Sequence, residues 1–423
     1  MKRSAIFSIL FLILFLKGSA MYLLIPMDDV QKDHLKSYGI AYWVLQKDVE
    51  VKWLLNYRGG SFLIPHYPEI ENECIIRGVS YENMADAQAS AILNEISSPD
   101  VNQDAVSMTK APKIAVYSPP NKQPWDDAVT LVLTYAEIPY DIIYDEEILA
   151  GTLKDYDWLH LHHEDFTGQH GKFWRTYQHM PWYQQEVKIN NDLAKKLGFM
   201  KVSEMKSFVS REIERYVQNG GFLFAMCAAT DTYDISLAAA GIDISQPMFD
   251  GDPMDSDADG KLDFKRTFAF EDFKLEKDPN VYEFSNIDAT QTRSTQHHVV
   301  RENDFFTLFE FSAKWDPIPT MLCQNHRNLI KGFMGQTTAY RKEVIKSNVL
   351  VMGENKPANE ARYIHGEKGR GFWTFYGGHD PEDYQHLIGD PPTDLNLHPN
   401  SPGYRLILNN ILFPAAKKKK RKT

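Results

Sequence analysis

The fold prediction starts from the stretch GGFLFAMCAATD, residues 220–231. Two glycines end a helical run, and Phe222 to Met226 then form an apolar segment of strand length. Cys227 follows where this strand must turn, and its neighbours are small. A strand, a nucleophile-type residue and a helix are the layout of a nucleophile elbow, in which the helix dipole favours the thiolate and lowers the thiol pKa.

The same residues also fit a structural cysteine at the end of a core strand, because free cysteine is among the most buried residue types. A working nucleophile needs a base such as an imidazole nearby. Residues 220–231 alone therefore leave both interpretations open.

The first twenty residues have the composition of a targeting segment. Lys2 and Arg3 precede the apolar run 5–16, and small residues end at Ala20. The run is too short to span a bilayer, so we expect a secretory signal cleaved after Ala20 and an exported protein, periplasmic or extracellular. No other run is long and apolar enough to predict a transmembrane segment.

Charge restricts the partners. The formal net charge is −11, and it becomes −20 for the body without the signal and the basic run Lys417–Lys422. Such a body repels nucleic acid, so no nucleic-acid partner is expected. The basic run is typical of a solvated tail; attachment to an acidic surface is the alternative. The three cysteines allow at most one bridge, Cys74 to Cys323, which would leave Cys227 free.

The first part of the chain reads as an N-terminal α/β segment, residues 21–110. Strands are expected at Met21–Met27 and Val51–Asn56, with a helix between them that Asp28 or Asp29 caps. Residues 76–96 predict one more strand and a helix, and the polar, aperiodic stretch 97–112 predicts a linker.

The second part alternates strands and helices, which predicts a parallel sheet with helices on both faces and ligands at the carboxyl ends of its strands. The fold class is therefore α/β, as in a flavodoxin-like three-layer domain over residues 111–414 with insertions at 164–198 and 244–370. Strands are expected at 114–117, 140–144, 157–162, 222–226 and 371–376, and helices at 125–136, 146–153, 203–219 and 401–412. A basic tail, 415–423, follows.

Residues 113–413 resemble the class I glutamine amidotransferase-like superfamily, most closely its extracytoplasmic, trehalose-utilisation-like branch. The residues that carry the resemblance are the elbow strand 220–227 and the last strand, which ends at Gly378-His379. The resemblance implies that Cys227 attacks an amide, that His379 takes its proton and that an acidic residue two places beyond orients the ring. Here Asp380 and Glu382 stand on either side of that place.

Other features depart from the amidotransferase pattern. Ala225 and Ala229 replace the two glycines of Gly-x-Cys-x-Gly, and the chain has no ammonia-accepting partner domain. The chain also resembles secreted Bacteroidetes proteins labelled asparagine synthetase B. It has neither an ATP-binding Ser-Gly-Gly-x-Asp-Ser loop nor an N-terminal catalytic cysteine directly after the predicted cleavage site, so asparagine synthesis rests on that label only.

Two hypotheses follow. In the first, the protein is a Cys–His hydrolase of an amide or ester, with Cys227 as nucleophile, His379 as base, Glu382 or Asp380 as orienting acid and the Ala228 N–H as oxyanion donor. In the second, it is a non-catalytic domain that binds a carbohydrate or a protein in the same cleft. Aromatic residues in the first insertion could stack on sugar rings, or could simply pack the insertion onto the domain: Phe173, Trp174, Tyr177, Trp182 and Tyr183.

Two further patterns suggest metals. His160 and His162 share one strand face, and His162 with Glu164 could chelate a metal; local hydrogen bonding is the alternative. Residues 255–263 match the first nine positions of a calcium loop through Asp255, Asp257, Asp259 and Asp263. Arg266 stands where the loop needs a bidentate acid, so an acidic turn is the alternative to weak calcium binding.

Overall fold

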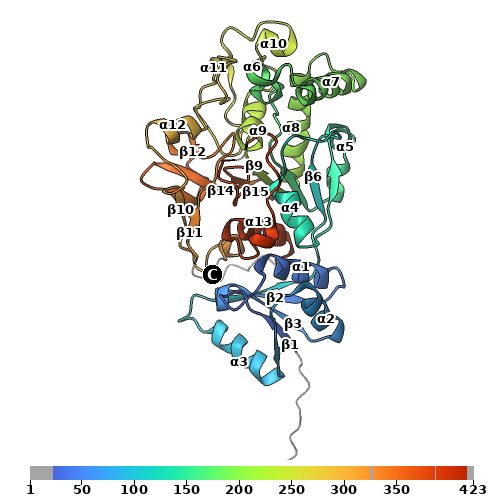
Figure 1. Ribbon diagram of the computed structural model, residues 1–423, viewed down its shortest axis with the longest axis vertical. Coiled ribbons are helices and arrows are strands. Elements are labelled where there is room, and N and C mark those ends of the chain that lie inside the picture. Colours follow the sequence, from blue (N-terminus) through green and yellow to red (C-terminus); the bar gives the residue numbers. More distant parts are fainter. Residues whose placement is uncertain (1–21, 324–326, 386, 417–423) are drawn as a thin grey trace, which may run out of the picture.

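Two β-sheets organise the chain in a computed structural model that describes residues 22–323, 327–385 and 387–416. The N-terminal part builds a five-stranded sheet, and the rest builds a ten-stranded sheet (Figure 1). The expected signal, residues 1–20, and the basic run Lys417–Lys422 lie outside the described residues.

The five-stranded sheet is antiparallel, with the order β4-β1-β3-β2-β5. Its strands are β1 (Tyr22–Ile25), β2 (Val51–Leu55), β3 (Ser61–Pro65), β4 (Glu82–Met84) and β5 (Asp104–Met108). Its helices are α1 (His34–Leu45), α2 (Pro68–Arg77) and α3 (Asp86–Ser97). Because side chains alternate along a strand, Leu23 and Ile25 join the main core while Leu24 enters a small core on the other side.

The start of α1 differs from the prediction. Asp33 caps the helix, and its Oδ1 accepts the N–H of Lys36 across 2.8 Å. Asp28 instead accepts a hydrogen bond from Arg58 across 2.7 Å, so the expected cap at Asp28 or Asp29 is wrong.

The expected linker, residues 97–112, is also wrong, because it contains β5. This strand pairs with β2 over its whole length. Only Val106 and Met108 are buried, and the polar residues Asp104 and Ser107 hid the strand from a search for apolar runs. The N-terminal part thus has a sheet of its own instead of extending the larger one.

The ten-stranded sheet is mixed. Five neighbouring strands, in the order β7-β6-β8-β9-β15, are parallel. These strands are β6 (Ile114–Tyr117), β7 (Asp141–Ile143), β8 (Trp158–Leu161), β9 (Phe222–Met226) and β15 (Gly371–Tyr376). Their order and direction place the carboxyl ends of β6, β8, β9 and β15 at one edge.

The other half of this sheet is antiparallel and comes from the second expected insertion, residues 244–370. It continues from β15 in the order β14-β13-β10-β11, and β12 also pairs with β14. Its strands are β10 (Phe305–Leu308), β11 (Leu329–Lys331), β12 (Tyr340–Arg341), β13 (Leu350–Asn355) and β14 (Glu360–Lys368). The insertion is therefore an extension of the sheet.

Helices cover both faces of the parallel strands, as the alternation of elements predicts. One face packs against α4 (Ala128–Tyr135) and α13 (Pro402–Leu412), and the other against α5 (Asp145–Leu149), α8 (Val202–Gln218) and α9 (Ala229–Ala238). The remaining helices are α6 (Trp174–Tyr177), α7 (Pro181–Lys196), α10 (Pro247–Asp250), α11 (Ala258–Lys261) and α12 (Thr290–Thr295).

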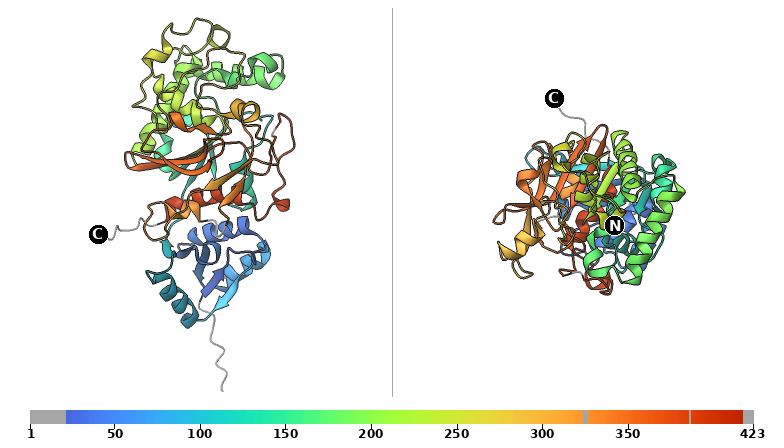
Figure 2. Two further views of the ribbon diagram at one scale, coloured as in Figure 1. Left: turned by 90° about the vertical axis from the view of Figure 1, so that its left-hand side faces the viewer. Right: turned by 90° about the horizontal axis from the view of Figure 1, so that it is seen from above.

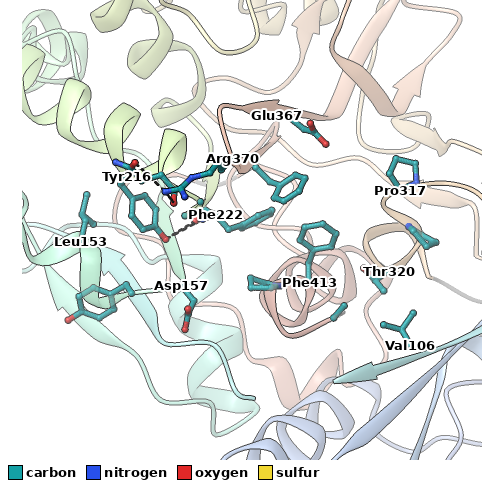
Figure 3. Close-up of a pocket in the computed structure, with 18 of the residues that line it drawn as sticks. Val106, Leu153, Asp157, Tyr216, Phe222, Pro317, Thr320, Glu367, Arg370 and Phe413 are labelled. Carbon is teal, nitrogen blue, oxygen red and sulfur yellow. Dashed lines mark hydrogen bonds between the residues drawn. The ribbon is translucent and has the colours of Figure 1, made fainter. Parts of the chain in front are cut away.

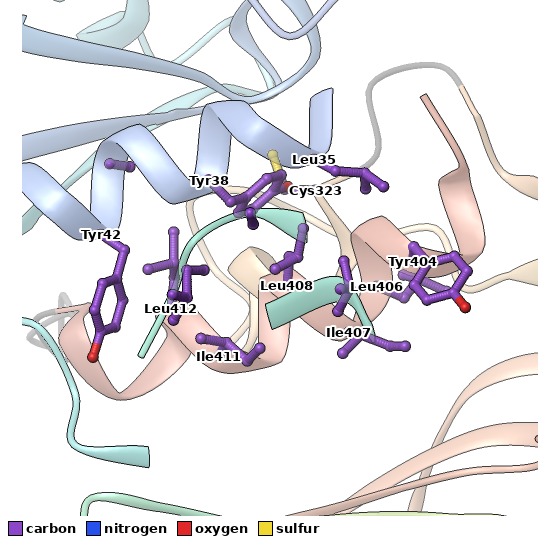
Figure 4. Packing of buried hydrophobic residues seen from close by; sticks show 14 of the residues in the cluster. Leu35, Tyr38, Tyr42, Cys323, Tyr404, Leu406, Ile407, Leu408, Ile411 and Leu412 are labelled. Atoms are coloured by element: carbon purple, nitrogen blue, oxygen red, sulfur yellow. The ribbon is translucent and has the colours of Figure 1, made fainter. Parts of the chain in front are cut away.

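The N-terminal part forms one end of an elongated molecule (Figure 2). Its helix α1 packs on α13 and α4, so that the two parts share one apolar core (Figure 4). The Tyr38 hydroxyl donates to Asn409 Oδ1 across 2.5 Å within this core. Gly39 allows the close approach, because a Cβ there would lie 1.9 Å from the Ala136 carbonyl oxygen.

The cysteines and the helices bear on two further predictions. Cys74, Cys227 and Cys323 are all free and buried, so the bridge that the cysteine count allowed is not formed. No helix among the described residues has the length and apolar character needed to cross a membrane.

Candidate functional site

Cys227 lies in the strand-to-helix turn that the sequence predicts. It follows β9 directly, and α9 begins at Ala229. Its φ of 50° is in the left-handed region, which a residue with a side chain rarely adopts. The Cys227 N–H donates to the Gly378 carbonyl across 3.1 Å, which ties the turn to the end of β15.

The thiol of Cys227 is covered. The backbone N–H of Gln336 donates to its Sγ across 3.4 Å, and only 3% of the residue is exposed. Burial raises the pKa of Cys227 to about 11, although backbone N–H groups of Gln336, Ala228 and Thr337 act in the opposite direction. This direction is the reverse of the lowered pKa expected from the helix dipole alone.

Residues 335–338 form the cover. The side-chain amide of Gln336 donates to the Gly171 carbonyl across 2.8 Å. The Thr337 hydroxyl donates to Asp231 Oδ1 across 2.8 Å, directly below in α9. The cover is thus hydrogen-bonded to both the first insertion and the helix that follows the cysteine.

His379 follows β15 at the same carboxyl edge and is buried. Its Nε2 lies 3.4 Å from Asp126 Oδ1, and its ring packs on His162 with the centroids 4.3 Å apart. Burial, followed by the neighbouring His162, lowers the pKa of His379, while Asp126 opposes that shift. The described contacts therefore place the thiol beside residues 336–337 and the imidazole beside Asp126 and His162.

The two acids expected to orient His379 have other partners. Asp380 Oδ1 accepts the backbone N–H of Glu382 across 2.8 Å. Glu382 Oε2 lies 3.2 Å from His398 Nδ1. The carboxylate on the ring of His379 is that of Asp126, which sequence analysis placed inside a helix and did not single out.

His160 of β8 and His162, which follows the strand, both contact a second aspartate. Asp127 Oδ2 lies 3.3 Å from His160 Nε2 and 3.3 Å from His162 Nδ1. The predicted shared face of the two histidines is therefore confirmed, while Glu164 Oε2 accepts the backbone N–H of His162 instead of facing its ring. Asp127 precedes α4 as its cap, so the helix starts later than the expected residue 125, and the preference of aspartate for the cap position could have signalled this start.

The carboxyl edge is closed on the side of the first insertion. A cavity of about 20 Å³, room for one water, lies between Trp125, His163 and Glu164. Trp182 and Phe173 pack on Trp125 with ring centroids 5.3 and 5.4 Å apart. The aromatic residues thus pack the insertion onto the domain, as the alternative to sugar stacking predicts.

The acidic loop does not gather its carboxylates. Asp255 pairs with Lys261 across 3.3 Å, Asp259 with Lys277 across 2.5 Å and Asp263 with Arg266 across 3.5 Å. Asp257 precedes the short helix α11. These ion pairs favour the acidic turn, and calcium binding stays a prediction.

A second cavity, of about 1560 Å³, lies at the opposite edge of the sheet (Figure 3). Its wall includes the amino ends of β9 and β15 at Phe222 and Phe372, and it reaches Val106 of the N-terminal sheet. Tyr216 and Phe413 add aromatic surface. Sequence analysis missed this cavity, because its wall combines segments that only the packing of the two sheets brings together.

Comparisons with known proteins give little. No family model and no curated protein matches the sequence. Two cytoplasmic proteins of Salmonella typhimurium are similar in structure, each over 72% of this chain and 100% of the other, at 10% and 11% identity with TM-scores of 0.33 and 0.32. Gan42B, a GH42 β-galactosidase, matches over 64% of this chain and 28% of its own, at 11% identity and a TM-score of 0.27. Likenesses this weak carry no conclusion about the chain.

Proposed function

We propose that the protein is an exported hydrolase that cleaves an amide or ester bond at the carboxyl edge of its parallel strands. The observation that carries the proposal is the backbone of Cys227, a residue with a side chain held at a φ of 50° between β9 and α9. Strain of this kind costs about 1–3 kcal/mol and clusters at functional sites. In a nucleophile elbow, this conformation presents the reacting atom.

The proposed chemistry assigns one role to each group. The sulfur of Cys227 attacks the carbonyl carbon, and the N–H of Ala228 binds the resulting oxyanion. His379, held by Asp126, takes the thiol proton and passes it to the leaving group; water then hydrolyses the thioester. Residues 335–338 must move first, because they cover the thiol and their displacement lets solvent lower its pKa.

The strand order supports an amidotransferase-like, three-layer domain over residues 111–414. Numbered along the chain, the parallel strands β7-β6-β8-β9-β15 have the order 2-1-3-4-5, which is that of flavodoxin-like folds. In such sheets, ligands bind beyond the carboxyl ends of the strands, where Cys227 and His379 lie. Export rests on the sequence of residues 1–20.

The hydrolase is tested with p-nitrophenyl acetate as ester probe and L-glutamine as amide probe. We expect a burst of p-nitrophenol, an acetyl adduct mapped to Cys227 by mass spectrometry, and loss of both in Cys227→Ser. Cys323→Ser changes a buried cysteine outside the site and should keep the activity. Turnover that is absent in the wild type, or equal in Cys227→Ser, would refute the proposal.

A non-catalytic binding domain is the second candidate, and the cavity of about 1560 Å³ favours it. Its aromatic wall at Phe222, Phe372 and Phe413 is suited to a sugar or another small ligand, and Arg370 adds a donor. Calorimetry with an oligosaccharide panel tests this candidate. Binding that Phe413→Ala weakens and Cys227→Ser leaves unchanged would support it, and a panel with no binding would remove it.

A further inference from the structure

Three potential metal ligands meet on the face of the sheet that α4 covers. Asp127 Oδ2 lies 3.3 Å from His160 Nε2 and 3.3 Å from His162 Nδ1, and the donor atoms of the three residues all lie within 4.8 Å of one another. Both histidines have an exposure of 0%. His162 packs on His379, so the cluster borders the proposed hydrolase site, but none of its three residues has a role in the proposed hydrolysis.

Hydrogen bonds fix which nitrogen of each ring carries a proton. His160 Nδ1 lies 3.1 Å from the Phe224 carbonyl oxygen, and His162 Nε2 lies 3.1 Å from the His379 carbonyl oxygen. A carbonyl only accepts, so these nitrogens donate. In a neutral ring, the other nitrogen then has a lone pair, and both lone pairs face the carboxylate of Asp127.

These two ring nitrogens are buried and make no hydrogen bond. Each lies 3.3 Å from Oδ2 of Asp127. Two imidazole nitrogens and a carboxylate oxygen that converge in this way are the arrangement of ligands around an ion.

We propose that Asp127, His160 and His162 bind one zinc ion through Oδ2, Nε2 and Nδ1. With metal–ligand bonds of about 2.0–2.1 Å, neighbouring ligands of a tetrahedron are about 3.3–3.4 Å apart, which matches both distances to Asp127. Two imidazoles and a carboxylate form a ligand set that suits zinc. A fourth position remains for a water molecule or a substrate oxygen.

The ligands are held in place by their own elements. Asp127 caps α4, and its Oδ1 accepts the Thr130 N–H across 2.9 Å, which fixes the carboxylate. The two backbone carbonyls that accept from His160 and His162 are the outer partners that metal-binding histidines normally have. The side chain of Asp127 keeps 14% exposure, so the site borders the surface.

The alternative is a cluster without metal, in which both imidazoles are protonated and surround Asp127. The variant Asp127→Asn distinguishes the zinc site from the metal-free cluster. Asparagine is as good a helix cap as aspartate, but it replaces the carboxylate ligand with a neutral amide. Asp33→Asn is the matched control: Asp33 caps α1 in the same way, through the N–H of Lys36, and lies outside the cluster.

The experiment measures zinc in the full mature chain by elemental analysis and by competition with a chromophoric chelator. We expect about one zinc per chain in the wild type. The same is expected of Asp33→Asn and Cys227→Ser, since neither substitution changes a ligand. In Asp127→Asn the affinity should fall more than about 100-fold, because loss of an outer partner alone costs about 10–100-fold.

Zinc should also raise the melting temperature of the wild type and of Asp33→Asn, but not that of Asp127→Asn. A wild-type chain that takes up no stoichiometric zinc, or an Asp127→Asn chain that binds it as tightly as the wild type, would overturn the site. Neither result depends on catalysis, so failure of the hydrolase and failure of the zinc site remain distinguishable.

Discussion

The backbone N–H of Gln336 donates to the sulfur of Cys227 across 3.4 Å, so the residue in the elbow is both held and covered by one neighbour. The side chain of Gln336 anchors this cover through the Gly171 carbonyl. Whether the elbow is a working nucleophile therefore depends on how readily residues 335–338 move.

Alkylation of Cys227 measures that movement. With the thiol buried and its pKa raised to about 11, iodoacetamide at pH 7 should label Cys227 slowly in the folded protein. Gln336→Ala removes the side-chain anchor and should increase the rate severalfold. Mass-spectrometric mapping follows the label, with Cys323, also buried, as the internal control. An unchanged rate at Cys227, or an equal increase at Cys323, would mean that Gln336 is not the cover.

A buried ion pair between α5 and α8 should be important for stability. Lys206 Nζ lies 2.7 Å from Asp145 Oδ2 and also donates to the Tyr117 hydroxyl. Lys206→Met leaves a buried carboxylate without its cation, which should lower the free energy of unfolding by about 3–5 kcal/mol. Adding Asp145→Asn should restore part of that loss. Urea unfolding measures both.

The control for this ion pair is Lys188→Met. Lys188 pairs with Asp192 on the surface of α7, where an ion pair contributes roughly 0–1 kcal/mol. Equal losses for Lys206→Met and Lys188→Met would contradict the assigned role of burial.

The contact between the two parts of the chain depends on Gly39. A Cβ there would lie 1.9 Å from the Ala136 carbonyl oxygen, so Gly39→Ala must separate α1 from α4. We expect a loss of about 1–3 kcal/mol in unfolding free energy, against the small gain that alanine gives elsewhere in a helix. Gln46→Ala, at the exposed end of α1, is the control and should change little. A neutral Gly39→Ala would mean that the helices are farther apart.

The parallel strands were predicted well because they are short apolar runs bounded by turn residues. The expected strands 114–117, 222–226 and 371–376 coincide with β6, β9 and β15. By contrast, β5 and the antiparallel strands β10 to β14 are very short or mix polar with apolar residues, and their pairing joins segments far apart in the chain. A local apolar pattern cannot reveal such strands.

The same limit applies to the site. Cys227 and His379 were placed at one edge because each follows an apolar strand, and the hydrogen bond from Cys227 to Gly378 joins the two strand ends. Asp126 and Asp127 were missed, since the expected helix 125–136 contained both, whereas α4 begins only at Ala128. Their contacts with the histidines join the segment after β6 to the ends of β8 and β15, which lie far apart in the chain.

Asp231, in the first turn of α9, should make stability depend on pH. It has an exposure of 0%; Oδ1 accepts from Thr337 and Oδ2 makes no hydrogen bond. Burial raises the pKa of Asp231 to about 7. A carboxyl group whose pKa is higher in the folded state favours folding at low pH, and this stability is lost as the pH rises from about 4, the unfolded value, to about 7.

Asp231→Asn keeps the hydrogen bond from Thr337 and is neutral at every pH. The unfolding free energy of Asp231→Asn, relative to that of the wild type, should therefore be higher at pH 8 than at pH 5 by roughly 2–3 kcal/mol. This corresponds to the part of the pKa difference between the folded and unfolded states, about two units, that takes effect between these pH values. Urea unfolding of both proteins at the two pH values measures this, and other titrating groups cancel in the comparison. Asp100→Asn, at an exposed position, should show no such change. If Asp231→Asn has the same effect at pH 5 and pH 8, Asp231 is already ionised at pH 5 in the folded protein. In that case burial does not raise its pKa.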